Sequence, residues 1–137
     1  MDSNIIQLCL LAAIAIGAIA TAIGIWISHR DQVKNQRVEV FATYTKRYQE
    51  ILILQQEAIN KYGEDPNNPE IRLAFRLYFD LCSEENYLHD HGYIYTDLWE
   101  NWFDGMQQDS DNELCQKMWE LHKGCYNDSH PFKDFYD

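Results

Sequence analysis

Residues 5–27 contain no charged side chain, although the 137-residue chain carries 11 Lys or Arg and 22 Asp or Glu. A helix of this length rises by about 35 Å, which is enough to cross the hydrocarbon core of a bilayer. The absence of charge therefore predicts one transmembrane helix over residues 5–27, preceded by a short tail at 1–4. The lipid bilayer is the first expected partner.

Proline and glycine are also scarce, with three Pro and six Gly in the chain. Neither occurs between Gln32 and Gly63, so nothing interrupts a helix there. Mostly apolar residues recur in that stretch at helical spacings of four and three. The pattern predicts a helix over residues 28–62 that continues the membrane helix, with this stripe facing the packed domain: Arg37, Phe41, Tyr44, Tyr48, Ile51, Gln55, Ala58 and Tyr62.

Start and stop signals divide residues 63–137 into further helices. Gly63 and Gly92 can supply the left-handed residues that end two of them. Three starts are predicted at polar caps, namely Asn68 before Pro69, Thr96, and Ser110 in a capping box with Glu113, and a final turn begins near Ser129 and Pro131. The predicted fold class is all-α, with one transmembrane helix and a cytoplasmic, aromatic-rich bundle of about four helices.

Positive charge is rare in the second half of the chain. Residues 64–137 carry five Lys or Arg against seventeen Asp or Glu. Such an acidic domain should be repelled by nucleic acid and by anionic lipid, which excludes both as direct ligands. A basic protein is the partner that this charge favours.

The basic residues Arg30, Lys34 and Arg37 lie just after the apolar span, whereas only Asp2 is charged before it. The positive-inside rule then places the N-terminus outside and the C-terminal domain in the cytoplasm, in a single-pass protein of the cell inner membrane. Trp26 is expected to be an interfacial anchor beside these basic residues. Small residues that share one face of the span favour self-association as a dimer or oligomer, although such residues are common in membrane helices generally: Ala13, Gly17, Ala20 and Gly24.

The usual signatures of catalysis are missing. The four cysteines, Cys9, Cys82, Cys115 and Cys125, form no CxxC pair, which argues against a zinc site or a redox dithiol. No glycine-rich phosphate loop, nucleophile elbow or HExxH occurs, so no cofactor is expected. Cys82 and Cys115 occupy apolar helical positions and are predicted to pack as thiols.

One pair of residues is a weak candidate for a metal or catalytic site. Glu85 and His89 are four residues apart and therefore on one helical face, where a carboxylate and an imidazole can share a metal ion or a proton. No matching ligand pattern occurs in another helix. The alternative is structural: His89 favours the negative end of its helix, and Glu85 accepts a hydrogen bond from a buried Tyr or Trp.

Three tryptophans also allow two interpretations. Trp99, Trp102 and Trp119 lie at helical spacings shared with Leu, Phe or Met, which favours core packing. If exposed, they could instead form a surface for a protein partner.

The segment Tyr78–Glu85, read as YFDLCSEE, is followed by Leu88, by GYI at 92–94 and by Trp99 and Trp102, and the chain also has RYQEI at 47–51. In these motifs it resembles a group of small bacterial single-span membrane proteins with a C-terminal helical domain. The resemblance implies the fold and the location and no reaction. Asn86 departs from it, since an aromatic or aliphatic residue is expected there.

Three functions follow from these patterns. The preferred one is a membrane-anchored, non-enzymatic helical module for interaction or regulation. The second is a membrane effector of a bacterial defence system, either toxin-like or anti-phage. The third is a metal- or carboxylate-dependent enzyme that uses Glu85 and His89.

Overall fold

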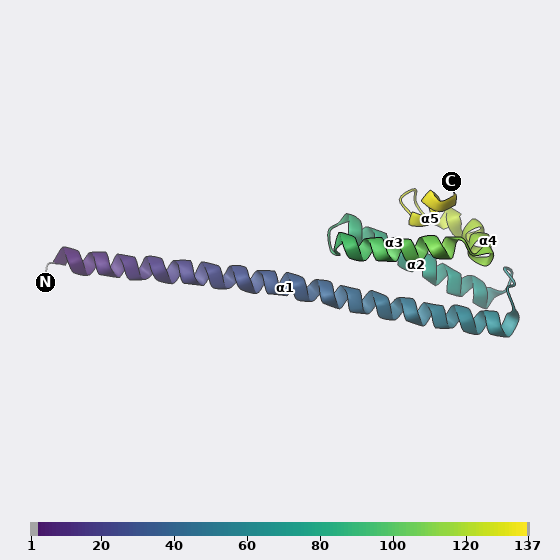
Figure 1. Ribbon diagram of the computed structural model, residues 1–137, viewed down its shortest axis with the longest axis horizontal. Coiled ribbons are helices and arrows are strands. Elements are labelled where there is room, and N and C mark those ends of the chain that lie inside the picture. The colour runs from purple at the N-terminus through teal and green to yellow at the C-terminus, as the bar shows by residue number, and fades with distance from the viewer. Residues whose placement is uncertain (1–2, 137) are drawn as a thin grey trace. The chain divides into compact units, whose positions relative to one another are not determined.

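The computed structural model describes residues 3–136, and this part of the chain is helical with no strand. Residues 1–2, within the predicted tail, and Asp137 lie outside the described residues. The elements are α1 (Ser3–Tyr62), α2 (Pro69–Asp90), α3 (Thr96–Ser110), α4 (Glu113–His122), the 3₁₀ helix η1 (Lys123–Cys125) and α5 (Pro131–Tyr136) (Figure 1). The predicted all-α class is confirmed, as is the continuity of residues 28–62 with the apolar helix.

The chain divides into two units, residues 1–38 and residues 39–137, and α1 contributes to both. In the first unit, α1 is long and apolar enough to cross a membrane, with a mean hydropathy of 2.4 in its most apolar window. No part of that window is buried by the rest of the chain. The Arg30 guanidinium lies 5.4 Å from the centre of the Trp26 ring, and the side chain of Cys9 is outside the described residues.

The second unit is built around α2. Its core side chains come from α1, α2, α3, α4 and α5, and those with no exposed area include Ile71, Phe79, Leu81, Cys82, Met118 and Phe132. The Phe79 ring lies 5.1 Å from the Phe132 ring and 5.2 Å from the Trp119 ring, both edge to face, a favourable geometry for aromatic pairs. The C-terminal tail therefore packs into the core through Phe132.

The predicted ends of the first two helices are confirmed. Gly63 and Gly92 adopt φ values of +73° and +72°, in the left-handed region that favours glycine. Asn68 caps α2 by accepting hydrogen bonds from the amides of Glu70 and Ile71, at 2.9 and 3.3 Å, directly before Pro69. These ends set the bounds of α2 and hence the positions of its buried side chains.

Two predicted caps are wrong by one or two residues. Thr96 is already helical, and Tyr95 precedes it as the cap residue, although its side chain does not cap the helix amides. Ser110 is the last residue of α3 and its hydroxyl donates to the carbonyl of Gln107 at 2.6 Å, so it cannot adopt the extended conformation of an N-cap. Asn112 caps α4 instead and accepts from the amides of Leu114 and Cys115, at 2.9 and 3.1 Å.

We predict that Asn112→Ala lowers the free energy of unfolding by about 1 kcal/mol, because two amides at the start of α4 lose their acceptor. Ser110→Ala is the matched control and should change it by less than about 0.5 kcal/mol, since its hydroxyl bonds a carbonyl within its own helix. Chemical denaturation of both variants checks the assignment. A larger loss for Ser110→Ala than for Asn112→Ala would contradict it.

Candidate functional site

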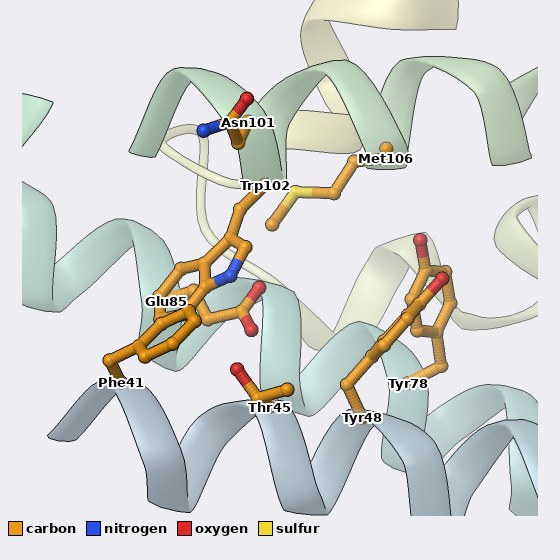
Figure 2. Close-up of a pocket in the computed structure, with 9 residues that line it drawn as sticks. Phe41, Thr45, Tyr48, Tyr78, Glu85, Asn101, Trp102 and Met106 are labelled. Atoms are coloured by element: carbon orange, nitrogen blue, oxygen red, sulfur yellow. The ribbon is translucent and has the colours of Figure 1, made fainter. Parts of the chain in front are cut away.

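A cavity of about 290 Å³ lies within the second unit, among α1, α2 and α3. Its lining is mainly aromatic and contains one carboxyl group (Figure 2). The lining residues are Phe41, Thr45 and Tyr48 from α1, Tyr78 and Glu85 from α2, and Asn101, Trp102, Gly105 and Met106 from α3.

Large rings on α1 and small residues between them leave the cavity open. Phe41 stacks on Trp102 with ring centres 6.5 Å apart, and Tyr48 lies 6.3 Å from Tyr78. One pair joins α1 to α3 and the other joins α1 to α2. Thr45, between Phe41 and Tyr48 on the same face of α1, is too short to fill the space, which explains why the core is incomplete here.

Glu85 is the carboxyl group in this cavity, and its side chain is only 5% exposed. It accepts no hydrogen bond from residues 3–136, which is unusual for a buried carboxyl group. Burial, reinforced by the charge of Glu84 and opposed by that of Arg47, raises the pKa of Glu85 to about 8. The group is therefore mostly protonated at neutral pH.

A second buried polar atom lies in the same cavity wall. The hydroxyl oxygen of Thr45 is buried and has no hydrogen-bond partner among the described residues. Figure 2 shows the Glu85 carboxyl group pointing into the space that Thr45, Tyr48 and Trp102 surround. The cavity thus holds two polar groups that form no hydrogen bond within the part of the chain that the structure describes.

The neighbouring carboxylate, Glu84, has the opposite surroundings. It accepts two hydrogen bonds from Arg47, at 2.6 and 3.1 Å, and one from the Tyr44 hydroxyl at 2.9 Å. The bonds from Arg47 lower the pKa of Glu84. Arg47 is thereby held at Glu84 and does not form an ion pair with Glu85.

The phenols at the cavity stay neutral over the physiological pH range. Burial raises the pKa of Tyr48 to about 12 and also raises the pKa of Tyr78. The Tyr78 hydroxyl donates to Asp109 at 2.5 Å. Glu85 is consequently the group in the cavity lining that can gain or lose a charge near neutral pH.

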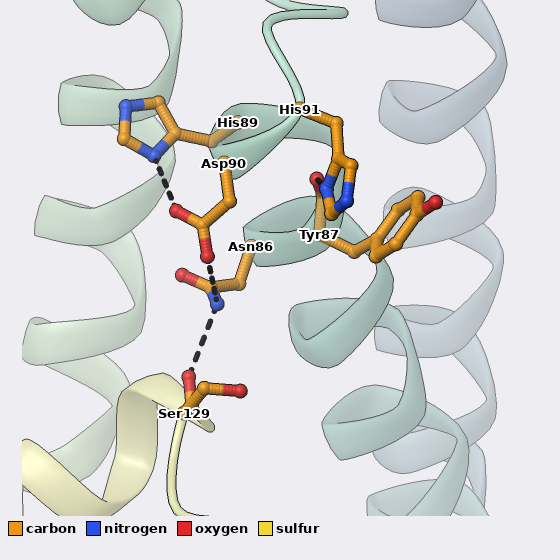
Figure 3. Close-up of polar contacts among 6 residues, drawn as sticks. All are labelled: Asn86, Tyr87, His89, Asp90, His91 and Ser129. Atoms are coloured by element: carbon orange, nitrogen blue, oxygen red, sulfur yellow. Dashed lines mark hydrogen bonds and ion pairs between the residues drawn. The ribbon is translucent and has the colours of Figure 1, made fainter.

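Of the predicted Glu85 and His89 pair, Glu85 lines the cavity and His89 does not. His89 stacks on Trp99 with ring centres 4.9 Å apart, and its Nδ1 lies 3.3 Å from Asp90 (Figure 3). Asp90 also accepts from the Asn86 amide at 3.3 Å, and that amide donates to the Ser129 carbonyl at 3.0 Å. Within residues 3–136, no three His, Cys, Asp or Glu side chains gather in a way that could hold a metal ion.

The three tryptophans fall into two groups. Trp119 is 1% exposed and belongs to the core, where its ring stacks on Tyr126 at 5.7 Å. Trp99 and Trp102 are half-buried, and Trp102 also forms a wall of the cavity. The predicted partner surface therefore reduces to parts of these two side chains.

The remaining predicted residues lie along the first unit of α1. Trp26, Arg30 and Lys34 are exposed, and Arg37 is half-buried. A Cβ atom added at Gly17 or Gly24 would meet no atom of this chain within 4 Å. The small-residue face is fully exposed: Ala13, Gly17, Ala20 and Gly24.

Sequence reasoning missed one buried polar residue. His130 is 1% exposed, and its Nε2 lies 2.9 Å from the Phe79 carbonyl oxygen while its Nδ1 accepts from the Phe132 amide at 3.2 Å. A carbonyl only accepts and an amide only donates, so the imidazole is neutral with its proton on Nε2. Nothing in the sequence near His130 indicates the distant carbonyl that it binds.

No family model, curated protein or solved structure matches this chain significantly. The function therefore has to be argued from the fold and from the cavity.

Proposed function

We propose that the chain is a single-pass, membrane-anchored helical module without enzymatic activity, whose acidic domain binds a basic protein in the cytoplasm. The observation that carries this proposal is the exposed apolar surface of α1. Leu11, Ile14 and Ile16 are each 66–68% exposed. A continuous apolar surface of this length is stable in a bilayer and not in water.

The proposed orientation rests on the basic residues at the end of the span. Arg30 and Lys34 are exposed and follow the apolar segment directly. Basic residues of this kind stay on the cytoplasmic side during insertion. The resemblance to small bacterial single-span proteins points the same way.

The proposed partner surface is the outer face of α3. Asp97, Glu100 and Asp104 are exposed, are spaced three and four residues apart, and make no ion pair among residues 3–136. No Lys or Arg occurs in α3. This row of uncompensated carboxylates would speed association with a basic protein and suppress association with acidic ones.

The exposed thiol of Cys125 allows a direct test of anchoring and orientation. Cys82 and Cys115 are buried, so a membrane-impermeant maleimide should label Cys125 in the folded domain. We predict that the protein resists alkaline extraction from membranes and that Cys125 is labelled only after the cells are lysed. Cys125→Ser is the control for labelling at this position. Labelling in intact cells would contradict the orientation.

Two charges in the span should abolish anchoring. Ile14→Lys together with Ile19→Lys adds roughly 5–7 kcal/mol to the free energy of insertion. The double variant is therefore expected to leave the membrane fraction, whereas Gln32→Lys, beyond the span, should stay in it. Retention of the double variant would refute the anchor.

The basic partner is tested by charge reversal on α3. Glu100→Lys with Asp104→Lys should abolish a salt-sensitive complex recovered from non-ionic detergent, whereas Glu50→Lys on α1 should leave it intact. A complex that survives reversal on α3 would refute this partner surface.

A further inference from the structure

The cavity among α1, α2 and α3 has chemistry that the interaction proposal does not use. It combines aromatic walls, a buried carboxyl group without a hydrogen bond and a buried hydroxyl without a partner. Its volume of about 290 Å³ is near the lower end of small-molecule sites, which measure about 300–1,000 Å³. Phe41 and Asn101 are exposed at its edge, so a ligand could enter beside them.

The polar groups exclude several ligand classes. An anion would meet the acidic side chain of Glu85 in a domain that is already strongly acidic. A metal ion would find one carboxylate among aromatic rings, and no cluster of three metal-binding side chains exists in the described residues. A neutral apolar molecule would leave the Glu85 carboxyl group and the Thr45 hydroxyl buried without hydrogen bonds.

An organic ammonium ion satisfies both groups at once. Its N–H donors suit the carboxylate of Glu85 and the hydroxyl oxygen of Thr45, and its positive charge is attracted by the faces of aromatic rings within about 6 Å. Its apolar body would occupy the space against Phe41, Tyr48 and Trp102, which line the cavity. The acidic domain would also raise the local concentration of such a cation.

We propose that this cavity binds a small organic cation, an ammonium group on an apolar body, with Glu85 as its counter-ion and Phe41, Tyr48 and Trp102 as its aromatic walls. The site does not depend on membrane anchoring or on the α3 surface. A negative result for cation binding would therefore leave the proposed membrane-anchored interaction module untouched, and a negative result for anchoring or partner binding would leave the cation site untouched.

Binding would be coupled to the release of a proton. Glu85 gives its proton to solvent, and the resulting carboxylate faces the ammonium group. Because the pKa of Glu85 is about 8 in the empty cavity, the affinity for the cation should increase as the pH rises to about 8. Arg47 remains paired with Glu84 and does not compete. The titratable and charged groups around the site are Arg47 and Tyr48 on α1, Tyr78, Cys82 and Glu84 on α2, and Asp109 on α3.

The test is calorimetric titration of the full chain in non-ionic detergent with benzylammonium and with its neutral counterpart, benzyl alcohol. Heats from protein-free micelles are subtracted. We expect saturable binding of benzylammonium at least tenfold tighter than that of benzyl alcohol. The binding heat should also depend on the ionisation enthalpy of the buffer, because the released proton is taken up by the buffer. Equal affinities, or no binding of either benzylammonium or tetramethylammonium up to about 10 mM, would overturn the proposal.

Two variants separate charge from volume. Glu85→Gln should weaken benzylammonium binding at least tenfold and abolish proton release, whereas Glu120→Gln, at an exposed carboxylate of α4, should change the affinity less than twofold. Gly105→Leu places a side chain in the cavity, where an added Cβ meets no atom within 4 Å, and should block the cation while leaving Glu85 in place. Unchanged binding by either Glu85→Gln or Gly105→Leu would overturn the site.

Discussion

Glu85→Gln should raise the free energy of unfolding at pH 7.5 by roughly 3 kcal/mol, although it replaces an ionisable residue with one that has nearly the same shape. The reason is the pKa of about 8 that burial gives this carboxyl group, compared with 4.5 when it is not perturbed. The folded state therefore holds a proton that the unfolded chain releases. A glutamine side chain is neutral in both states and avoids this difference.

The direction of the pH dependence follows from the same pKa values. Below pH 4.5 Glu85 is protonated in both states, so burial costs no deprotonation. As the pH rises from 4.5 to 8, the unfolded chain loses its proton while the folded protein keeps it, and stability falls. Above pH 8 both states are ionised and this contribution stops changing.

The experiment measures unfolding of the full chain in non-ionic detergent from pH 5 to pH 8.5, following tryptophan fluorescence. The stability difference between Glu85→Gln and the wild type should grow with pH and then level off. Glu84→Gln is the adjacent control and should instead lower stability by less than about 1 kcal/mol, because it weakens an exposed pair with Arg47. A gain for Glu85→Gln that is independent of pH would contradict the assigned pKa.

This prediction and the binding proposal describe two consequences of one arrangement. An unpaired carboxyl group in an aromatic cavity destabilises the empty protein at neutral pH, and an ammonium ligand would remove that penalty by supplying the missing charge. Glu85→Gln is therefore expected to stabilise the domain and to weaken the binding of the cation. Such a trade-off is typical of binding and catalytic sites.

The sequence predicted the helices well because their signals are local. Gly63, Asn68 with Pro69, and Gly92 lie within a turn of the ends that they specify, and the structure has those ends. Ser110 was misassigned because Ser110 and Asn112 offer competing caps two residues apart, and only the backbone conformation distinguishes them.

The cavity was only partly predictable. The sequence indicates Glu85 as a candidate through its i,i+4 spacing to His89, although the residue lies among the buried apolar positions of α2. In the structure it lines one cavity together with Tyr48 from α1 and Trp102 from α3. The register between helices determines these contacts, and a single helical pattern carries no information about that register.

His130→Ala should lower the free energy of unfolding by about 3–5 kcal/mol, the second large effect that we predict. The substitution leaves a void beside Trp119, whose ring centre lies 4.6 Å from that of the imidazole. It also leaves the Phe79 carbonyl and the Phe132 amide without their hydrogen-bond partner. His91→Ala is the matched control, since His91 is exposed and stacks on Tyr87, and it should cost less than about 0.5 kcal/mol.

The pH dependence of His130 has the opposite direction to that of Glu85. Burial lowers the pKa of His130 below 6.5, helped by Lys133 and opposed by the Phe79 carbonyl and by Asp80. Its stabilising contribution is present above pH 6.5 and is lost as the pH falls, because the unfolded chain binds a proton that the folded core rejects. In the wild type, the stability that Glu85 adds as the pH falls towards 4.5 offsets part of this loss. Glu85→Gln removes that offset, so the stability of this variant should clearly decrease below pH 6.5. Adding His130→Gln to Glu85→Gln should reduce that decrease, with the remainder due to His122, whose pKa burial also lowers. A decrease that His130→Gln leaves unchanged would assign the acid sensitivity to other groups.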